Sequence, residues 1–255
     1  MNNHGFRGPD SAIIARGRRI ACIGDSLTLG EGVRWEHTFT ALLSERLSTA
    51  DSPVEVLNFG INGYELLHER VLLEQVVSQF EPDFVIWQFY PNDVAVFDVD
   101  ELGAEIRDSE LSWRFLTTSS RLVNWISRRL WTRQATARMT SGMLAIYDQH
   151  WDELVAEFTR VQRFTQRMGA GLLVVMFPDL DFLSRGDYAL RPIHARLADF
   201  FDAQGIQQID LTEVFSEHGP EALWVHPVDA HPNEIGHRLA AEALLAELEN
   251  STDLR

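Results

Sequence analysis

Five short apolar runs, separated by segments with helical periodicity, constrain the fold of this chain more than any other feature. The runs are rich in β-branched and aromatic residues and are mostly apolar on both faces, which is typical of central strands in a parallel sheet. They lie at residues 19–24, 54–59, 84–90, 171–177 and 206–211. This alternation predicts an α/β fold in which helices cover both faces of a five-stranded parallel sheet.

Three of the intervening segments carry clear helical signals. Apolar residues recur at spacings of three and four over 151–168, which ends at a glycine, and over 66–80, which stops before Pro82. The last predicted helix begins after Asn233, a favourable N-cap residue, and runs to about residue 248.

Length and composition indicate one globular domain over residues 1–255 and exclude several classes of protein. The formal net charge of −16 argues against a nucleic-acid partner, because neutralising phosphates needs a basic face. The chain has no lysine, which excludes a Walker-type phosphate loop, a Schiff base and a Ser–Lys pair. The lone cysteine, Cys22, excludes an intramolecular disulfide. Without an apolar signal segment or membrane-length run, the chain is expected to be cytoplasmic.

The regular alternation is interrupted once, after the third strand. More than fifty residues separate it from the next predicted helix near Asp148, so we interpret 94–147 as a partly helical insertion within the domain. Within it, residues 111–138 combine arginines and tryptophans without an acidic residue. The preferred interpretation is a cap packed over the ligand crevice; contact with a membrane surface is the alternative.

Polar residues follow every predicted strand at its carboxyl end, where open parallel sheets bind their ligands. They comprise a hydroxyl, side-chain amides, imidazoles and carboxylates, which are the groups of an acyl-transfer site. They lie in the segments Gly24-Asp25-Ser26, Gly60-Ile61-Asn62-Gly63, Pro91-Asn92-Asp93 and Pro178-Asp179, and at His226, Asp229 and His231.

The chemical properties of these polar residues indicate a catalytic role for several of them. A serine hydroxyl becomes a useful nucleophile when a histidine takes its proton, and a carboxylate on the other ring nitrogen would orient that histidine. The N–H groups of Ser26 and Gly60 and the Asn92 amide could stabilise the oxyanion of a tetrahedral intermediate.

Four ordered segments make the chain resemble the SGNH/GDSL hydrolases. They are Ile23-Gly24-Asp25-Ser26-Leu27, Asn58-Phe59-Gly60-Ile61-Asn62-Gly63, Pro91-Asn92-Asp93 and the segment from Asp229 to His237. The resemblance implies a three-layer, flavodoxin-like α/β/α sandwich and hydrolysis of carboxylic esters through an acyl-serine, with no metal or cofactor. Ser26 would be the nucleophile and His231 the base, with Gly60 and Asn92 completing the oxyanion hole beside Ser26. The substrate would be a small-molecule ester or another acylated compound.

Two positions depart from the family pattern. Tyr90 stands where the family has a glycine, two residues before the asparagine. Val228 stands three positions before His231, where the family places its carboxylate, and Asp229 lies two before it. We therefore assign Asp229 as the orienting carboxylate, with a backbone carbonyl as the alternative.

Other interpretations of the same residues remain open. Ser26 could be only a helix cap, Gly60 and Asn92 only turn residues, and the three histidines His226, His231 and His237 could bind zinc with Asp229. The serine chemistry could also serve an O-acetyltransferase. From a different class, the fold could be a non-catalytic carbohydrate- or lipid-binding module. The oligomeric state is not predicted.

Overall fold

The computed structural model describes residues 1–255 except 14–16, 50–51, 98–120, 185 and 251–255. The chain divides into two compact units, residues 1–93 with 152–255, and residues 94–151. The single-domain interpretation and the cap and membrane roles of 94–147 and 111–138 stay predictions, since 98–120 lie outside the described residues. Helix α5 (Arg121–Met168) is continuous, so the expected helix start near Asp148 was wrong.

A five-stranded parallel sheet forms the centre of the first unit, as the apolar runs predict. Its strands are β1 (Arg18–Gly24), β2 (Val54–Gly60), β3 (Phe84–Phe89), β4 (Gly171–Met176) and β5 (Gln207–Asp210). They are ordered β2-β1-β3-β4-β5, so the chain reverses its direction of travel between β2 and β3. The ligand crevice of such a sheet lies where the strand order reverses, at the carboxyl ends of β1 and β3.

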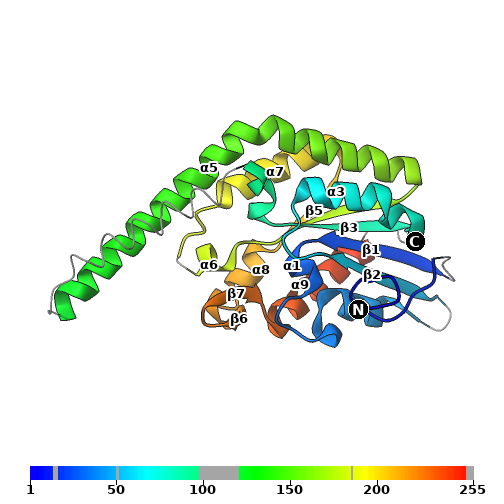
Figure 1. The fold of residues 1–255 in the computed structure, drawn as a ribbon, viewed down its shortest axis with the longest axis horizontal. Coiled ribbons are helices and arrows are strands. Elements are labelled where there is room, and N and C mark those ends of the chain that lie inside the picture. The colour runs from blue at the N-terminus through cyan, green and yellow to red at the C-terminus, as the bar shows by residue number, and fades with distance from the viewer. Residues whose placement is uncertain (14–16, 50–51, 98–120, 185, 251–255) are drawn as a thin grey trace. The chain divides into compact units, whose positions relative to one another are not determined.

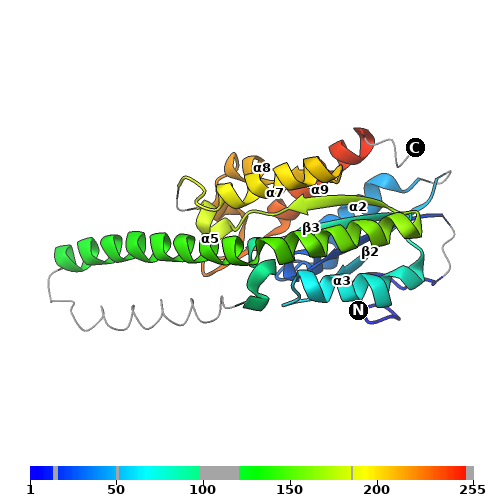
Figure 2. The ribbon, with the colours of Figure 1, turned by 90° about the horizontal axis from the view of Figure 1, so that it is seen from above.

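Helices cover both faces of this sheet (Figures 1 and 2). Helices α2 (Phe39–Leu47) and α9 (Glu234–Asn250) cover one face, and α3 (Leu66–Gln75), α7 (Arg191–Gln204) and the last part of α5 cover the other. Right-handed crossovers explain this division, because connections that run in opposite directions along the sheet pass over opposite faces. The predicted three-layer α/β/α architecture is confirmed.

Shorter elements complete the described chain. The single-turn helices are α1 (Ser26–Leu29), α6 (Leu180–Leu183) and α8 (Thr212–Ser216). The 3₁₀ segments are η1 (Trp35–His37), η2 (Val77–Phe80), η3 (Pro91–Phe97) and η4 (Pro220–Leu223). A small antiparallel pair, β6 (Trp224–His226) and β7 (Asp229–Pro232), precedes α9. None of the helices within the described ranges has the length and hydropathy of a membrane span.

Aromatic side chains fill the core between the sheet and its helices. Phe158 of α5 packs against Phe89 of β3 and Phe201 of α7, with ring centroids 5.7 and 4.9 Å apart. Phe177, directly after β4, contacts Phe39 of α2 at 5.9 Å. All five rings are buried, and each stabilises the fold by about 2–3 kcal/mol because its apolar surface is removed from water. This packing holds the strand ends that carry the candidate site.

Candidate active site

Ser26 is presented by a tight turn between β1 and α1. Asp25 caps α1, because its Oδ1 accepts a hydrogen bond of 2.8 Å from Leu27 N–H, and its own N–H donates to Gln88 Oε1. A Cβ on Gly24 would lie 2.2 Å from that same Oε1, so only glycine lets the strand pass Gln88 at this point. The structure therefore explains why glycine and aspartate precede Ser26. The turn that they form leaves Ser26 facing the crevice.

The structure brings His231 to Ser26 from the far end of the chain. His231 lies on β7, and its Nε2 is 2.9 Å from Ser26 Oγ. Its Nδ1 is 2.6 Å from Asp229 Oδ1, which also accepts a hydrogen bond from the His231 N–H. A carboxylate can only accept, so Nδ1 carries the ring proton and Nε2 is free to accept the serine proton.

Asp229 reaches the imidazole although it lies only two positions before His231. The carboxylate folds back over its own turn and binds both N–H groups of the histidine, while Val228 points to solvent with 86% exposure. Partial burial opposes ionisation of Asp229, but the hydrogen bonds from His231 outweigh it and hold the pKa of this carboxyl below its ordinary value. Asp229 thus presents a charged oxygen to the ring.

An open cleft of about 390 Å³ lies in front of Ser26. The turns after β1, β2 and β3 and the segment before His231 line it, as expected for the carboxyl edge of the sheet. Its lining residues are Asp25, Ser26, Leu27, Asn62, Gly63, Tyr90, Asn92, Val228, Asp229, Ala230 and His231.

The structure corrects the assignment of Gly60 to the oxyanion hole. Its N–H already donates to Asn58 Oδ1 at 2.9 Å in the buried interior, and Gly60 does not line the cleft. A Cβ at this position would come within 2.1 Å of Leu29 N, so this residue is glycine because β2 and α1 approach closely.

Gly63, three residues later, occupies the place that Gly60 was expected to take. It lines the cleft with a φ of +73°, a conformation that favours glycine. Among the described residues, no group accepts a hydrogen bond from the N–H of Gly63 or Ser26 or from the Asn92 side-chain amide. Three unpaired donors therefore border the same cleft. The second glycine of Gly60-Ile61-Asn62-Gly63 was the signal that could have identified Gly63.

Asn92 is held in the cleft by a closed turn. The Asp93 N–H donates to Tyr90 O at 2.9 Å, and the Tyr90 N–H donates to Asp93 Oδ2 at 2.7 Å. Tyr90, at the position where the family has glycine, leaves Asn92 in place and contributes to the cleft wall.

A buried polar chain lies behind Tyr90. The Tyr90 hydroxyl interacts with the Asp179 carboxyl, and the Asp179 N–H donates to the Tyr188 hydroxyl at 3.0 Å. That hydroxyl is 3.1 Å from His194 Nε2, and His194 Nδ1 is 3.0 Å from Asp210 Oδ2. These hydrogen bonds connect the cleft wall to the ends of β4 and β5. Asp179 was expected at this edge of the sheet, whereas Tyr188, His194 and Asp210 were not.

Three carboxyl groups are buried behind the nucleophile turn. Burial raises the pKa of Asp25 to about 6, and burial together with the neighbouring acids raises the pKa values of Glu69 and Asp93 well above their ordinary values. Trp87 is the donor that interacts with the Glu69 carboxyl, but no hydrogen bond of good geometry forms there among the described residues. Burial therefore favours the neutral forms of Glu69 and Asp93, and no pattern in the sequence indicated Glu69.

The zinc alternative finds no support in the placement of the histidines. His237 is fully buried in α9, where its Nδ1 accepts a hydrogen bond of 3.3 Å from Phe39 N–H, and burial lowers its pKa to about 3. Within the described part of the chain, no cluster of three histidine, cysteine, aspartate or glutamate side chains has the geometry of a metal site.

Comparison with known proteins agrees with this fold. The sequence pattern of the GDSL-like Lipase/Acylhydrolase family matches residues 22–239. No curated protein matches the chain.

Several solved structures share the architecture at low sequence identity. A lipolytic protein of the G-D-S-L family from Veillonella parvula is 15% identical, with a TM-score of 0.53 over 90% of this chain and 97% of its own. The acetyl xylan esterase AlAXEase is 16% identical, with a TM-score of 0.56 over 90% and 98%. A catalytic mutant of the acetylxylan esterase Axe2 from Geobacillus stearothermophilus is 17% identical, with a TM-score of 0.52 over 92% and 96%.

Proposed function

The chain belongs to the GDSL-like Lipase/Acylhydrolase family, and we propose that it is a serine hydrolase of carboxylic esters. One observation carries the proposal. A single cleft contains a serine hydroxyl 2.9 Å from a carboxylate-bound imidazole and three hydrogen-bond donors that no described group uses. If Ser26 were only a helix cap and Asn92 only a turn residue, these groups would not need to meet at one cleft.

Acylation would begin with proton transfer from Ser26 Oγ to His231 Nε2 as the oxygen attacks the ester carbonyl carbon. The negative charge then moves to the carbonyl oxygen, where the N–H groups of Ser26 and Gly63 and the Asn92 amide are available as donors. One such donor typically contributes about 3–4 kcal/mol to transition-state stabilisation. When the carbonyl re-forms, the alcohol leaves with the proton from Nε2, and the acyl group remains on Ser26.

Deacylation would repeat these steps with water in place of the alcohol. His231 takes a proton from water as its oxygen attacks the acyl carbon, and then returns that proton to the departing Ser26 Oγ. Throughout, Asp229 stabilises the imidazolium and keeps the ring orientation. The cycle needs no group beyond those present in the cleft.

The comparisons support testing acetylated carbohydrates first. Two of the structurally similar proteins are named as acetyl xylan esterases, and at 16% and 17% identity their likeness to this chain is one of fold. The open cleft, with Tyr90 in its wall, is consistent with a short acyl group on a larger alcohol.

The test is hydrolysis of 4-nitrophenyl acetate and of acetylated xylo-oligosaccharides by the wild type, Ser26→Ala and His231→Ala. We expect each variant to lose at least a thousandfold in kcat with unchanged circular dichroism, and Ser26→Ala to lose labelling by a fluorophosphonate probe. Ser78→Ala, whose hydroxyl donates to Glu74 O on α3, is the matched control. Absence of labelling in the wild type would instead favour a non-catalytic module. Acyl transfer to an added sugar that outpaces hydrolysis would favour an O-acetyltransferase.

A further inference from the structure

A carboxylate that the hydrolytic mechanism does not use lies beside the reacting nitrogen. Glu31 Oε2 is 3.9 Å from His231 Nε2, the atom that also contacts Ser26 Oγ. The Glu31 side chain is 42% exposed, so solvent reaches this carboxylate beside the reacting nitrogen. Asp229 binds the opposite ring nitrogen, which means that Glu31 cannot replace it as the orienting group.

The backbone around Glu31 is held firmly in place. The Glu31 N–H donates to Ser26 O at 3.0 Å, and the flanking glycines have φ values of +79° and +81°. A Cβ on Gly30 would meet Thr38 Cγ2 at 2.4 Å, and one on Gly32 would meet Val225 Cγ1 at 2.8 Å. The turn is therefore packed on both sides.

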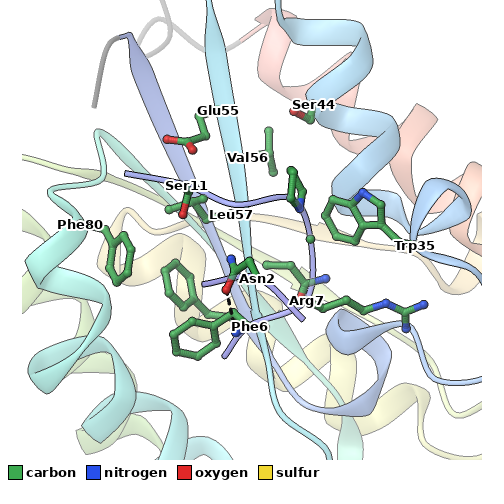
Figure 3. A pocket seen from close by; sticks show the side chains of 14 residues that line it. Asn2, Phe6, Arg7, Ser11, Trp35, Ser44, Glu55, Val56, Leu57 and Phe80 are labelled. Carbon is green, nitrogen blue, oxygen red and sulfur yellow. Dashed lines mark hydrogen bonds between the residues drawn. The ribbon is translucent and has the colours of Figure 1, made fainter. Parts of the chain in front are cut away.

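The N-terminal segment also restrains this turn. Residues from Asn2 to Ser11 cross β2 and enclose a small cavity of about 50 Å³ (Figure 3). From this segment the Arg7 guanidinium donates hydrogen bonds to the carbonyl oxygens of Leu29, Gly30 and Val33. Arg7 therefore binds the turn through its carbonyl groups, and the Glu31 carboxylate remains directed at the site.

Apart from His231, the side chains that line the cleft are negative or neutral. Asp25 and Asp229 line the cleft, and none of its lining residues in the described chain is an arginine. His226, which faces Asp229, is a further titratable group at this edge. An anion that enters the cleft thus meets Asp25 and Asp229, with Glu31 beside His231, and Arg7 is engaged with the carbonyl groups of the turn.

We propose that Glu31 is a specificity-determining residue that selects the leaving alcohol by charge, favouring uncharged or cationic alcohols and rejecting anionic ones such as phosphorylated carriers. The inference rests on the proposed esterase function. In that mechanism His231 Nε2 donates its proton to the departing oxygen, so this oxygen comes within hydrogen-bond distance of Nε2 and within about 7 Å of the Glu31 carboxylate. The Glu31 carboxylate then repels a negative charge on the alcohol. At the intermediate dielectric of a half-exposed site, this repulsion should lower kcat/KM for an anionic ester by roughly fivefold to tenfold relative to a neutral one.

The experiment uses three acetate esters of similar size. They are 3,3-dimethylbutyl acetate, which is neutral, acetylcholine, which is cationic, and 2-acetoxyethanesulfonate, which is anionic. Values of kcat/KM are measured at pH 8 and low salt, and each is divided by the rate of hydroxide hydrolysis to remove intrinsic reactivity. We expect the wild type to prefer the neutral and cationic esters over the anionic one. Glu31→Gln should reduce the neutral-to-anionic ratio by about fivefold while it retains activity on the neutral ester.

Two controls test whether the change in the neutral-to-anionic ratio is caused by the charge of Glu31. Glu36→Gln changes an exposed carboxylate that pairs with Arg34, and should leave the ratio unchanged. Raising NaCl to 0.5 M should reduce the wild-type ratio without any substitution, because salt screens exposed charges. An unchanged ratio in Glu31→Gln, or a wild type that hydrolyses the anionic ester as well as the neutral one, would overturn the inference and leave the esterase function intact. Absence of Ser26-dependent hydrolysis of every ester would overturn both.

Discussion

Replacement of Asp229 tests how much the orienting carboxylate contributes to the proposed reaction. Asp229 Oδ1 lies 2.6 Å from His231 Nδ1, which places the centres of the two charged groups roughly 4 Å apart. At that separation an ion pair is worth about 1 kcal/mol in bulk water and about 4 kcal/mol at an effective dielectric of 20. The Asp229 side chain is 41% exposed, so solvent screening places its contribution between these values, at about 2 kcal/mol.

We therefore expect Asp229→Asn to lower kcat for 4-nitrophenyl acetate by about thirtyfold with little change in KM, because the imidazolium forms only in the transition state. A buried aspartate in the same role contributes about 10⁴-fold, and the exposure of Asp229 is the reason for the smaller value. Asp199→Asn, on the exposed surface of α7, is the control for loss of a carboxylate. A decrease below twofold would show that Asp229 does not act on His231. A decrease as large as that of His231→Ala would show that Asp229 contributes far more than about 2 kcal/mol to the transition state.

Three further predictions follow from the site. Asn92→Ala should lower kcat by about 10²–10³-fold without unfolding the protein, because the exposed amide is one of the unpaired donors at the cleft; steady-state kinetics with circular dichroism checks this. Glu69→Gln should become more stabilising, relative to the wild type, as the pH rises above the ordinary carboxyl pKa of 4.5. The pKa of Glu69 is raised in the folded state, so its contribution is favourable below the ordinary value of 4.5 and is lost as pH rises toward the folded-state pKa; urea unfolding of both proteins at each pH measures the difference, and a difference independent of pH contradicts the prediction. Tyr90→Ala should widen the cleft and raise kcat/KM for butyrate relative to acetate esters by about tenfold, and an unchanged ratio would show that Tyr90 does not border the acyl group.

The architecture was predictable because it depends on periodic features of the chain. Buried strands of a parallel sheet need continuous apolar runs, and the five runs correspond to the five observed strands. The carboxyl ends of parallel strands meet at one edge, so the segments that follow them were expected to converge. The structure places Ser26, Asn92, Asp229 and His231 around one cleft at this edge.

Other features depend on distances that no spacing in the sequence encodes. Gly60 and Gly63 look equivalent as turn glycines, and only the close approach of β2 to α1 shows that the first is a packing residue and the second borders the cleft. Similarly, the reach of Asp229 to His231 depends on how the carboxylate folds over its own turn.

Local patterns of apolar and turn-forming residues are properties of neighbouring positions, and they specify the sheet and the edge at which chemistry can occur. The orientation of each donor and carboxylate at that edge depends on contacts between segments as distant as Ser26 and His231. Such contacts form only when the chain is packed, since side-chain direction follows from the combined fit of the turns around the cleft. For this reason Glu31 and Gly63 acquire their places at the site only in the folded protein.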